Sequence, residues 1–231
     1  MEVALVTVGD ELLSGDTVNT NGAWLGRRLH ERGVTVERST TVPDRKADIA
    51  RVVNEYLAEY DAVLVTGGLG PTHDDLTMEA VGAALGRPVE PNEEALAWLE
   101  EHGGYASDDL AKGTADLPKG ARPLHNTVGV APGCVVDDVY VFPGVPSEME
   151  AMFRSVADEF SGEIQHVTVV EAAEPESSLL DRFETLREQF DVKVGSYPGE
   201  FVRVRLEGEE GEVERAAAWL RERVEAPEPE E

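Results

Sequence analysis

Twelve residues in the first third of the chain have the types and the order of an anion-binding site. They begin at Thr66 and read Thr-Gly-Gly-Leu-Gly-Pro-Thr-His-Asp-Asp-Leu-Thr. The apolar run at 62–65 predicts a buried parallel strand, and residues 78–85 predict a helix. Backbone N–H groups of a glycine loop and of a helix N-terminus attract anions such as phosphate. The loop residues that we predict to bind the phosphates of a ligand are Thr66, Gly67, Gly68 and Gly70.

Two adjacent carboxylates, Asp74 and Asp75, lie in the same run, where the phosphates of such a ligand would arrive. This arrangement is electrostatically favourable if a divalent metal ion, Mg²⁺ or similar, bridges carboxylate and phosphate. We therefore predict that Asp74 and Asp75 are metal ligands with a catalytic role. The alternative is that they cap the following helix and interact favourably with its dipole.

Two further loops follow predicted strands, one after residues 3–8 and the other after residues 140–142. In an open α/β sheet the loops at the carboxyl ends of the strands meet in one crevice, where ligands bind. A fourth segment, 126–133, ends in a glycine turn and is expected to close over the same crevice. The ligand contacts that we predict from these segments are Gly129, Pro143 and Gly144.

The loop after the first strand carries polar side chains of two kinds. Asp10 and Glu11 are candidate catalytic residues that complete the metal site or position a water molecule, and the alternative is that they solvate an acidic loop. Ser14 and Asn21 are candidates to bond a ribose or the edge of a base. Their alternative is to cap the helix that follows.

Composition limits the classes of function. The 47 acidic and 20 basic residues give a net charge of −27, which we interpret as adaptation to a salty cytoplasm because salt screens self-repulsion. Nucleic-acid phosphates need a basic surface that this chain lacks, so we expect no nucleic-acid partner. No apolar stretch reaches the length of a membrane span, and the single Cys134 fits a reducing compartment. We expect a soluble, cytoplasmic protein with no membrane partner.

The order of predicted elements divides the chain into two domains. Residues 1–162 alternate strands and helices, which predicts an α/β domain with a mostly parallel sheet covered on both faces. Residues 163–225 predict a small α+β domain in the order strand, helix, hairpin, helix. On its hairpin, Arg203 and Arg205 alternate with apolar residues, the ordinary pattern of a half-exposed sheet. The acidic, proline-bearing tail at 226–231 is predicted to be disordered.

Five motifs together resemble the competence/damage-inducible protein A (CinA) family, whose core is the molybdopterin-binding domain shared with the MoaB and MogA proteins. The motifs are residues 9–15, Asn19 with Asn21, residues 66–77, residues 126–133 and residues 143–149. The resemblance implies a three-layer molybdopterin-binding-like fold for the first domain and a KH-like fold for the second. Longer relatives continue into an amidase domain, which we do not expect in a chain that ends at Glu231.

This resemblance implies a pocket for a nucleotide or pterin that carries a pyrophosphate. The CinA core is associated with metal-dependent hydrolysis of ADP-ribose, and the MogA type with adenylylation of molybdopterin. The resemblance also implies a homo-oligomer, a dimer or trimer, and a phosphate contact for Lys112, whose alternative is a solvated helix end. We predict a metal-dependent hydrolase of a nucleotide pyrophosphate. The alternatives are a molybdopterin adenylyltransferase or molybdopterin-binding protein, and a non-catalytic nucleotide or pterin sensor.

Overall fold

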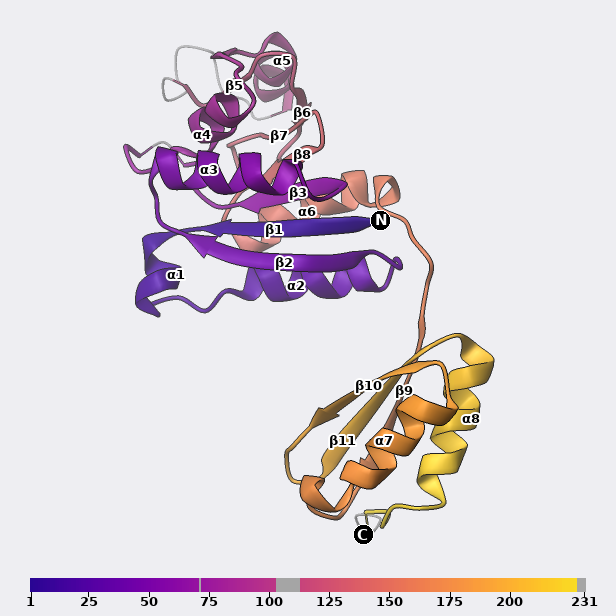
Figure 1. The fold of residues 1–231 in the computed structure, drawn as a ribbon. Coiled ribbons are helices and arrows are strands. Elements are labelled where there is room, and N and C mark those ends of the chain that lie inside the picture. The colour runs from indigo at the N-terminus through magenta and orange to yellow at the C-terminus, as the bar shows by residue number, and fades with distance from the viewer. Residues whose placement is uncertain (71, 103–112, 228–231) are drawn as a thin grey trace. The chain divides into compact units, whose positions relative to one another are not determined.

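The computed structural model describes residues 1–70, 72–102 and 113–227 of the chain. It divides into two compact units, Met1–Glu163 and Ile164–Glu231. Each unit, drawn as a ribbon in Figure 1, has its own buried core of apolar side chains. Among the described residues, no helix is both long enough and apolar enough to cross a membrane.

Unit 1 is built on a six-stranded, mostly parallel sheet with the strand order β2-β1-β3-β8-β7-β6, which confirms the predicted fold class. The first four strands in this order are parallel, and each of the last two runs antiparallel to its neighbour. The strands are β1 (Glu2–Val8), β2 (Thr35–Val42), β3 (Ala62–Thr66), β6 (Arg122–Leu124), β7 (Gly133–Val136) and β8 (Val139–Phe142). A separate antiparallel pair joins β4 (Val89–Pro91) to β5 (Asp116–Pro118).

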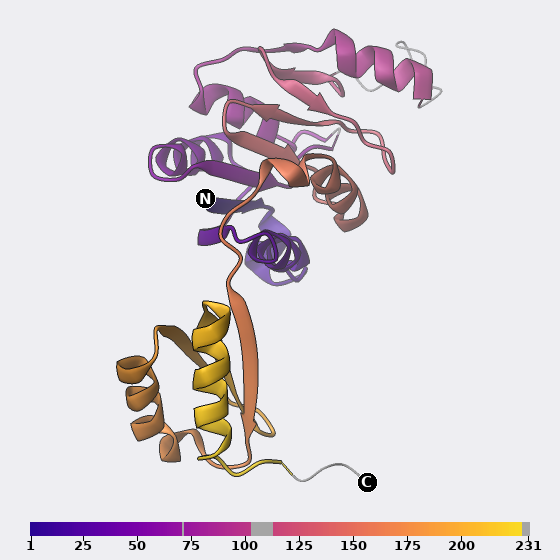
Figure 2. The same cartoon turned by 90° about the vertical axis from the view of Figure 1, so that its right-hand side faces the viewer.

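Helices cover both faces of this sheet, so that unit 1 has three layers (Figures 1 and 2). On one face, α3 (Lys46–Leu57), α4 (Thr77–Ala84) and α5 (Glu93–His102) bury aliphatic side chains against the strands. On the other face, α2 (Thr20–His30) and α6 (Pro146–Val156) do the same. Strands buried on both faces need continuous apolar sequence, which is what β1 and β3 have.

Several short elements of unit 1 differ from the sequence-based expectation. Residues Asp10–Ser14, predicted as part of a loop, form the short helix α1, so that prediction is wrong. The helix begins after Gly9 and ends at Gly15, whose φ of 81° is left-handed. The strands β4 to β7 were not predicted, because each has only three or four residues and gives no readable alternation.

Unit 2 is a small α+β unit with an antiparallel sheet in the order β10-β11-β9. Its elements are β9 (His166–Ala172), α7 (Leu180–Gln189), β10 (Val192–Tyr197), β11 (Val202–Gly208) and α8 (Glu210–Arg221), with a 3-10 turn at Glu176–Ser178. Both helices pack on the same face of the sheet around a core that includes Phe183, Val204 and Leu220. Residues 228–231, at the end of the predicted acidic tail, lie outside the described residues.

Candidate functional site

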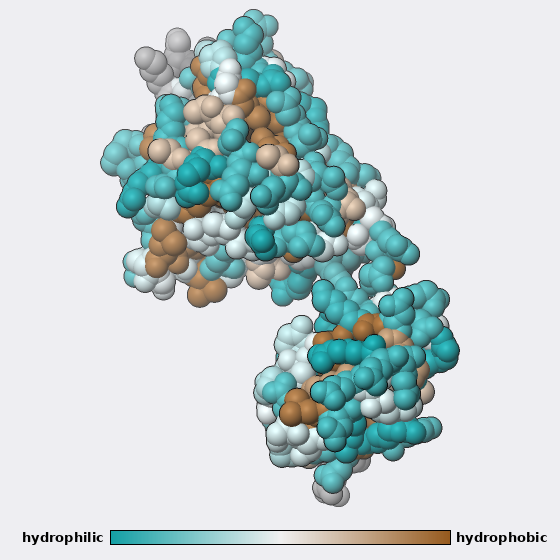
Figure 3. Space-filling view, viewed as in Figure 1, coloured by the Kyte–Doolittle hydropathy of each residue, from teal (hydrophilic) through white to brown (hydrophobic). Residues whose placement is uncertain are grey.

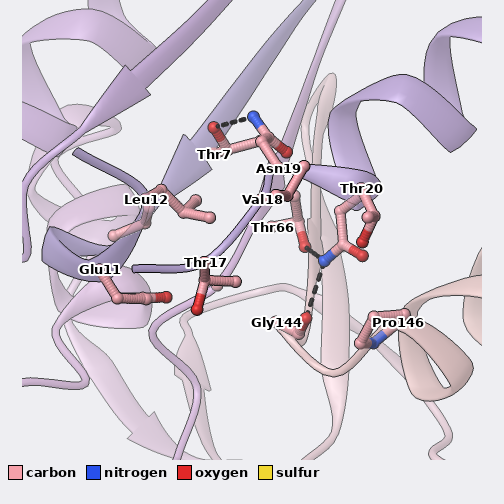
Figure 4. A pocket seen from close by; sticks show the side chains of 13 residues that line it. Thr7, Glu11, Leu12, Thr17, Val18, Asn19, Thr20, Thr66, Gly144 and Pro146 are labelled. Atoms are coloured by element: carbon pink, nitrogen blue, oxygen red, sulfur yellow. Dashed lines mark hydrogen bonds between the residues drawn. The ribbon is translucent and has the colours of Figure 1, made fainter. Parts of the chain in front are cut away.

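A pocket opens at the carboxyl ends of β1, β3 and β8, where α2 and α6 begin (Figure 4). This is the edge of an open α/β sheet at which ligands usually bind. Four short segments form its wall. The lining residues are Thr7, Val8, Glu11, Leu12, Thr17, Val18, Asn19, Thr20, Asn21, Thr66, Gly67, Gly144 and Pro146.

Threonine side chains form a row across the strand ends beneath the pocket. Thr7 pairs with Thr41 on one side and with Thr66 on the other. Thr7 and Thr66 are 1% and 2% exposed, although each continues a run of apolar residues. The hydroxyl groups of Thr7 and Thr41 are hydrogen-bonded at 2.8 Å. Because a buried hydroxyl group needs a hydrogen-bond partner, this row places polar groups at the base of the pocket, at the carboxyl edge of the sheet.

Two asparagines fix the N-terminus of α2 to this row of threonines. The Asn19 side chain donates to Thr7 Oγ1 at 2.9 Å, and its Oδ1 accepts from Gly22 N at 2.9 Å, which caps the helix. The Asn21 side chain donates to Thr66 Oγ1 at 3.1 Å and to the Gly144 carbonyl oxygen at 2.8 Å (Figure 4). One side chain therefore joins α2, the end of β3 and the loop after β8.

The loops after β3 and β8 approach each other closely at two glycines. Gly67 has a φ of 108°, and a Cβ atom there would collide with the carbonyl oxygen of Val8. A Cβ on Gly144 would lie 3.4 Å from the Gly67 Cα. The Thr66 hydroxyl donates to the Pro143 carbonyl at 2.8 Å and joins the same two loops. A side chain at Gly67 would displace its loop from β1, so glycine is required there, whereas a Cβ at Gly144 would be in ordinary van der Waals contact.

The described lining of the pocket contains one charged side chain, Glu11, and no lysine or arginine. The buried Oδ1 atom of Asn21 has no hydrogen-bond partner in the structure. Apolar contact comes from Leu12, Pro146 and Val18, the last of which is 78% exposed. Hydrophobic surface extends over α1 beside the pocket, where Leu13 is 53% exposed (Figure 3). This lining suits an uncharged ring or sugar that donates hydrogen bonds, rather than a bare phosphate.

The aspartates at 74 and 75 lie outside this lining, in the loop that leads from β3 to α4. Asp75 Oδ2 accepts hydrogen bonds from Thr72 N at 2.9 Å and from Thr72 Oγ1 at 2.5 Å. Asp74 Oδ1 lies 2.7 Å from His73 Nε2. The loop is tied to the pocket through Thr77, whose hydroxyl donates to the Gly67 carbonyl at 2.8 Å. The two carboxylates are therefore linked through a hydrogen-bonded turn to a loop that lines the pocket.

The predicted metal ligands fit one kind of metal site. Within the described residues, no group of three or more histidine, cysteine, aspartate or glutamate side chains is arranged to hold a metal ion. Magnesium at nucleotide sites is commonly held by only one or two carboxylates together with phosphates of the substrate. Asp74 and Asp75 supply that number. Asp10, one of the two residues expected to complete the metal site, begins α1 and donates its backbone N–H to Asp44 Oδ2 at 2.7 Å.

The predicted site residues fall into two groups. Glu11, Asn21, Thr66, Gly67 and Gly144 line one pocket, and the Pro143 carbonyl accepts a hydrogen bond from the lining residue Thr66. The other described candidates lie outside the pocket lining: Gly68 and Gly70 in the loop after β3, Ser14 bonded to Asp16, and Gly129 bonded through its N–H to Asn126. Lys112 lies outside the described residues.

Sequence reasoning gave no role to several lining residues, including Thr7 and Thr17. A usable signal was present for the first of these. Both Thr7 and Thr66 follow four apolar residues at the start of their predicted strands. A hydroxyl-bearing residue at the same place in two neighbouring buried strands indicates a shared polar edge. Thr17 belongs to a loop whose position the pattern does not determine.

Comparison with known proteins agrees with this fold. A family model described as a probable molybdopterin binding domain matches residues 4–162. A protein of Aeropyrum pernix is 42% identical over 235 residues, covering 93% of this chain and 87% of that protein. A CinA-like protein of Citrifermentans bemidjiense is 44% identical over 173 residues, covering 71% of this chain but 42% of that protein. A crystal structure described as the protein CinA with unknown function from Thermoplasma acidophilum superposes with a TM-score of 0.64 at 38% identity, covering 69% of this chain and 97% of that one.

Proposed function

The chain belongs to the family of probable molybdopterin binding domains, and we propose that unit 1 binds a nucleotide or pterin pyrophosphate and hydrolyses its phosphoanhydride bond with the help of a divalent metal ion. The observation that carries the proposal is the division of the site into two chemical parts. One is the pocket, whose described lining is polar but includes no lysine or arginine side chain. The other is the adjoining glycine loop with its two aspartates.

The pocket is the part that fits the ring or sugar of the ligand. Glu11 and the Oδ1 of Asn21 are hydrogen-bond acceptors, and ribose hydroxyl groups and the amino groups of purines or pterins are donors. Val18 and Leu12 add apolar surface for a flat ring. A phosphate in direct contact with Glu11 would be repelled, so the pyrophosphate belongs toward Gly67, with a water molecule between it and the Glu11 carboxylate.

The loop after β3 is the part that fits the pyrophosphate. Asp74 and Asp75 would hold the metal ion, which when bound would draw charge from the phosphates. Thr72 fixes the Asp75 carboxylate through two hydrogen bonds, and Thr77 fixes the Gly67 carbonyl, so the loop is held in place before a ligand arrives. Glu11 on the pocket wall is the carboxylate that we assign to orient the attacking water.

Adenylyl transfer to molybdopterin is the second candidate, and its support is that the family description names molybdopterin as the ligand. It would use the same two-part site, because it also acts on a phosphoanhydride. The products separate the two candidates. We expect purified protein with ADP-ribose and Mg²⁺ to yield AMP and ribose 5-phosphate. Failure with ADP-ribose together with ATP-dependent adenylylation of molybdopterin would transfer the assignment to the second candidate.

Two substitutions test the assigned roles. In the Asp75→Asn variant the amide oxygen still accepts from Thr72, so the turn is kept while the negative charge is removed. We expect this variant to lose metal-dependent turnover without losing stability. Glu11→Gln should lower kcat at unchanged metal dependence. Ser14→Ala, in the same helix but outside the pocket, is the control. Wild-type turnover in both Asp75→Asn and Glu11→Gln would contradict the assignment.

A further inference from the structure

An ion pair joins the first turns of two helices that cover the same face of the unit 1 sheet. Lys46 begins α3, Glu79 lies in the first turn of α4, and Lys46 Nζ lies 3.0 Å from Glu79 Oε2. The two helices lie side by side in Figure 1 and contact each other. Because α3 follows β2 and α4 follows β3, the pair lies at the carboxyl edge of the sheet, where ligands bind.

The start of α4 adjoins the glycine loop to which we assign the pyrophosphate. Thr77 begins this helix, and it donates from its hydroxyl to the Gly67 carbonyl at 2.8 Å and from its N–H to the Gly68 carbonyl at 3.3 Å. Glu79 is two residues further along the chain, about 3 Å along the helix axis. Since Glu79 pairs with the ammonium group of Lys46, that cation lies at the end of α4 that is joined to the loop.

The start of α3 is also tied to the short helix α1, which supplies the pocket residue Glu11. Asp44 lies two residues before Lys46 and accepts from the backbone N–H of Asp10 at 2.7 Å. Asp10 begins α1, and Glu11 follows it in the chain. Lys46 is therefore connected by short segments to both parts of the proposed site.

The charges of the proposed site call for a cation in addition to the metal ion. A divalent metal ion on Asp74 and Asp75 offsets the charge of those two carboxylates and no more, so the charge of the pyrophosphate remains to be balanced. The described lining of the pocket has no lysine or arginine. Beside Lys46, Arg45 pairs with Asp48 of its own helix, at 3.8 Å. Lys46 is the neighbouring cation whose partner lies on α4.

The contact between Lys46 and Glu79 is one that a phosphate can replace. Their side chains are 49% and 55% exposed, and an exposed ion pair contributes little to stability. The lysine side chain is flexible and ends in three rotatable donors. A pyrophosphate carries more negative charge than one carboxylate and attracts the ammonium group more strongly.

We propose that Lys46 leaves Glu79 and binds the pyrophosphate of the ligand, an inference that rests on the proposed function of unit 1. Glu79 holds the ammonium group at the edge of the site until the phosphates arrive, and it competes with them for this cation. Removing Lys46 therefore weakens phosphate binding, and removing the charge of Glu79 strengthens it. A pair that only joins two helices would affect stability in both cases and phosphate binding in neither.

Titration calorimetry of the full chain with methylenediphosphonate and Mg²⁺ at one salt concentration tests the proposal. This probe has the two phosphorus groups of a pyrophosphate but no anhydride bond to hydrolyse. We expect Lys46→Met to raise the dissociation constant about tenfold, the effect of losing one hydrogen bond to a charged group. Lys119→Met is the matched control, because Lys119 is also exposed and pairs with a glutamate, Glu90, at 3.7 Å. It should bind the probe like wild type.

The Glu79→Gln variant tests the competition. It should bind the probe about threefold more tightly than wild type, because glutamine keeps the shape of the side chain without its charge. In the Lys46→Met background the same substitution should have little effect, since the cation that it releases is gone. An equal gain in both backgrounds would mean that Glu79 acts only by repelling the probe, and this would overturn the exchange.

The proposal is also overturned if Lys46→Met and Lys119→Met bind the probe equally, or if wild type does not bind it. Cleavage of ADP-ribose is measured separately, so the two proposals can fail independently. Probe binding with the expected effects of Lys46→Met and Glu79→Gln supports the assignment of Lys46 even in a protein that leaves ADP-ribose intact, whereas cleavage with unchanged probe binding in both variants refutes it.

Discussion

Replacing Thr66 by valine removes one hydroxyl group from the junction of the two pocket loops. That hydroxyl donates to the Pro143 carbonyl and accepts from Asn21. Asn21 keeps its bond to the Gly144 carbonyl, but the buried Pro143 carbonyl loses its partner. A buried polar group left unsatisfied costs about 1–3 kcal/mol, so we expect the free energy of unfolding of unit 1 to fall by about 2 kcal/mol.

Urea denaturation followed by tryptophan fluorescence measures this change. Trp24 and Trp98 lie in unit 1 and Trp219 in unit 2, so a Trp219→Phe background reports on unit 1 alone. With a urea dependence of about 2 kcal/mol per M, the midpoint should fall by about 1 M. Thr41→Val is the control. Within the described residues the half-buried Thr41 hydroxyl has Thr7 as its one hydrogen-bond partner, so this substitution should lower the free energy of unfolding by less than about 1 kcal/mol. A Thr66→Val midpoint equal to that of the control would refute the role given to this junction.

Three further outcomes follow from the structure. Gly67→Ala should destabilise unit 1 more than Gly86→Ala, because both glycines have positive φ but only Gly67 has no room for a Cβ. Equal losses of unfolding free energy in paired urea titrations would contradict this. Burial raises the pKa of the Cys134 thiol to about 12, and burial with a hydrogen bond to Glu159 raises the pKa of Tyr140 to about 12. Both groups then lose their protons first in the unfolded chain, so the melting temperature should fall as pH rises from about 9 to 12, and a constant melting temperature would contradict this. The net charge of −27 predicts that the melting temperature rises between about 0.1 M and molar potassium chloride, and a flat or falling series would refute it.

The long elements of the fold could be predicted from the sequence because each has a strong pattern. The apolar run at 62–65 predicts a buried strand, and the observed strand, Ala62–Thr66, extends that run by one residue. The helix predicted at 78–85 is observed one residue earlier, at Thr77–Ala84. The strands β6 and β7 could not be predicted, because three or four residues carry no periodicity and their pairing depends on contacts distant in sequence.

The site was only partly predictable for a different reason. Glycines and carboxylates after strands indicate one edge of the sheet as the site, and five of the predicted residues line a pocket at that edge. The sequence does not indicate where each loop turns. Asp75 is held by Thr72 in a local turn and lies outside the pocket lining, whereas Thr17 and Thr20, which have no predicted role, belong to that lining. Loop paths depend on hydrogen bonds between residues distant in sequence, such as the one from Asn21 to the Gly144 carbonyl.

Amide NMR spectra of the full chain, recorded while ADP-ribose is added with Mg²⁺, test the central claim most directly. The claim is that the ligand occupies the pocket at the ends of β1, β3 and β8, with its pyrophosphate toward the glycine loop. We predict that the backbone N–H signals of Gly67 and Gly144 and the side-chain amide signals of Asn21 shift on addition, while those of unit 2 stay unchanged. Saturable shifts confined to other residues, or no shifts with either ADP-ribose or molybdopterin, would contradict the account.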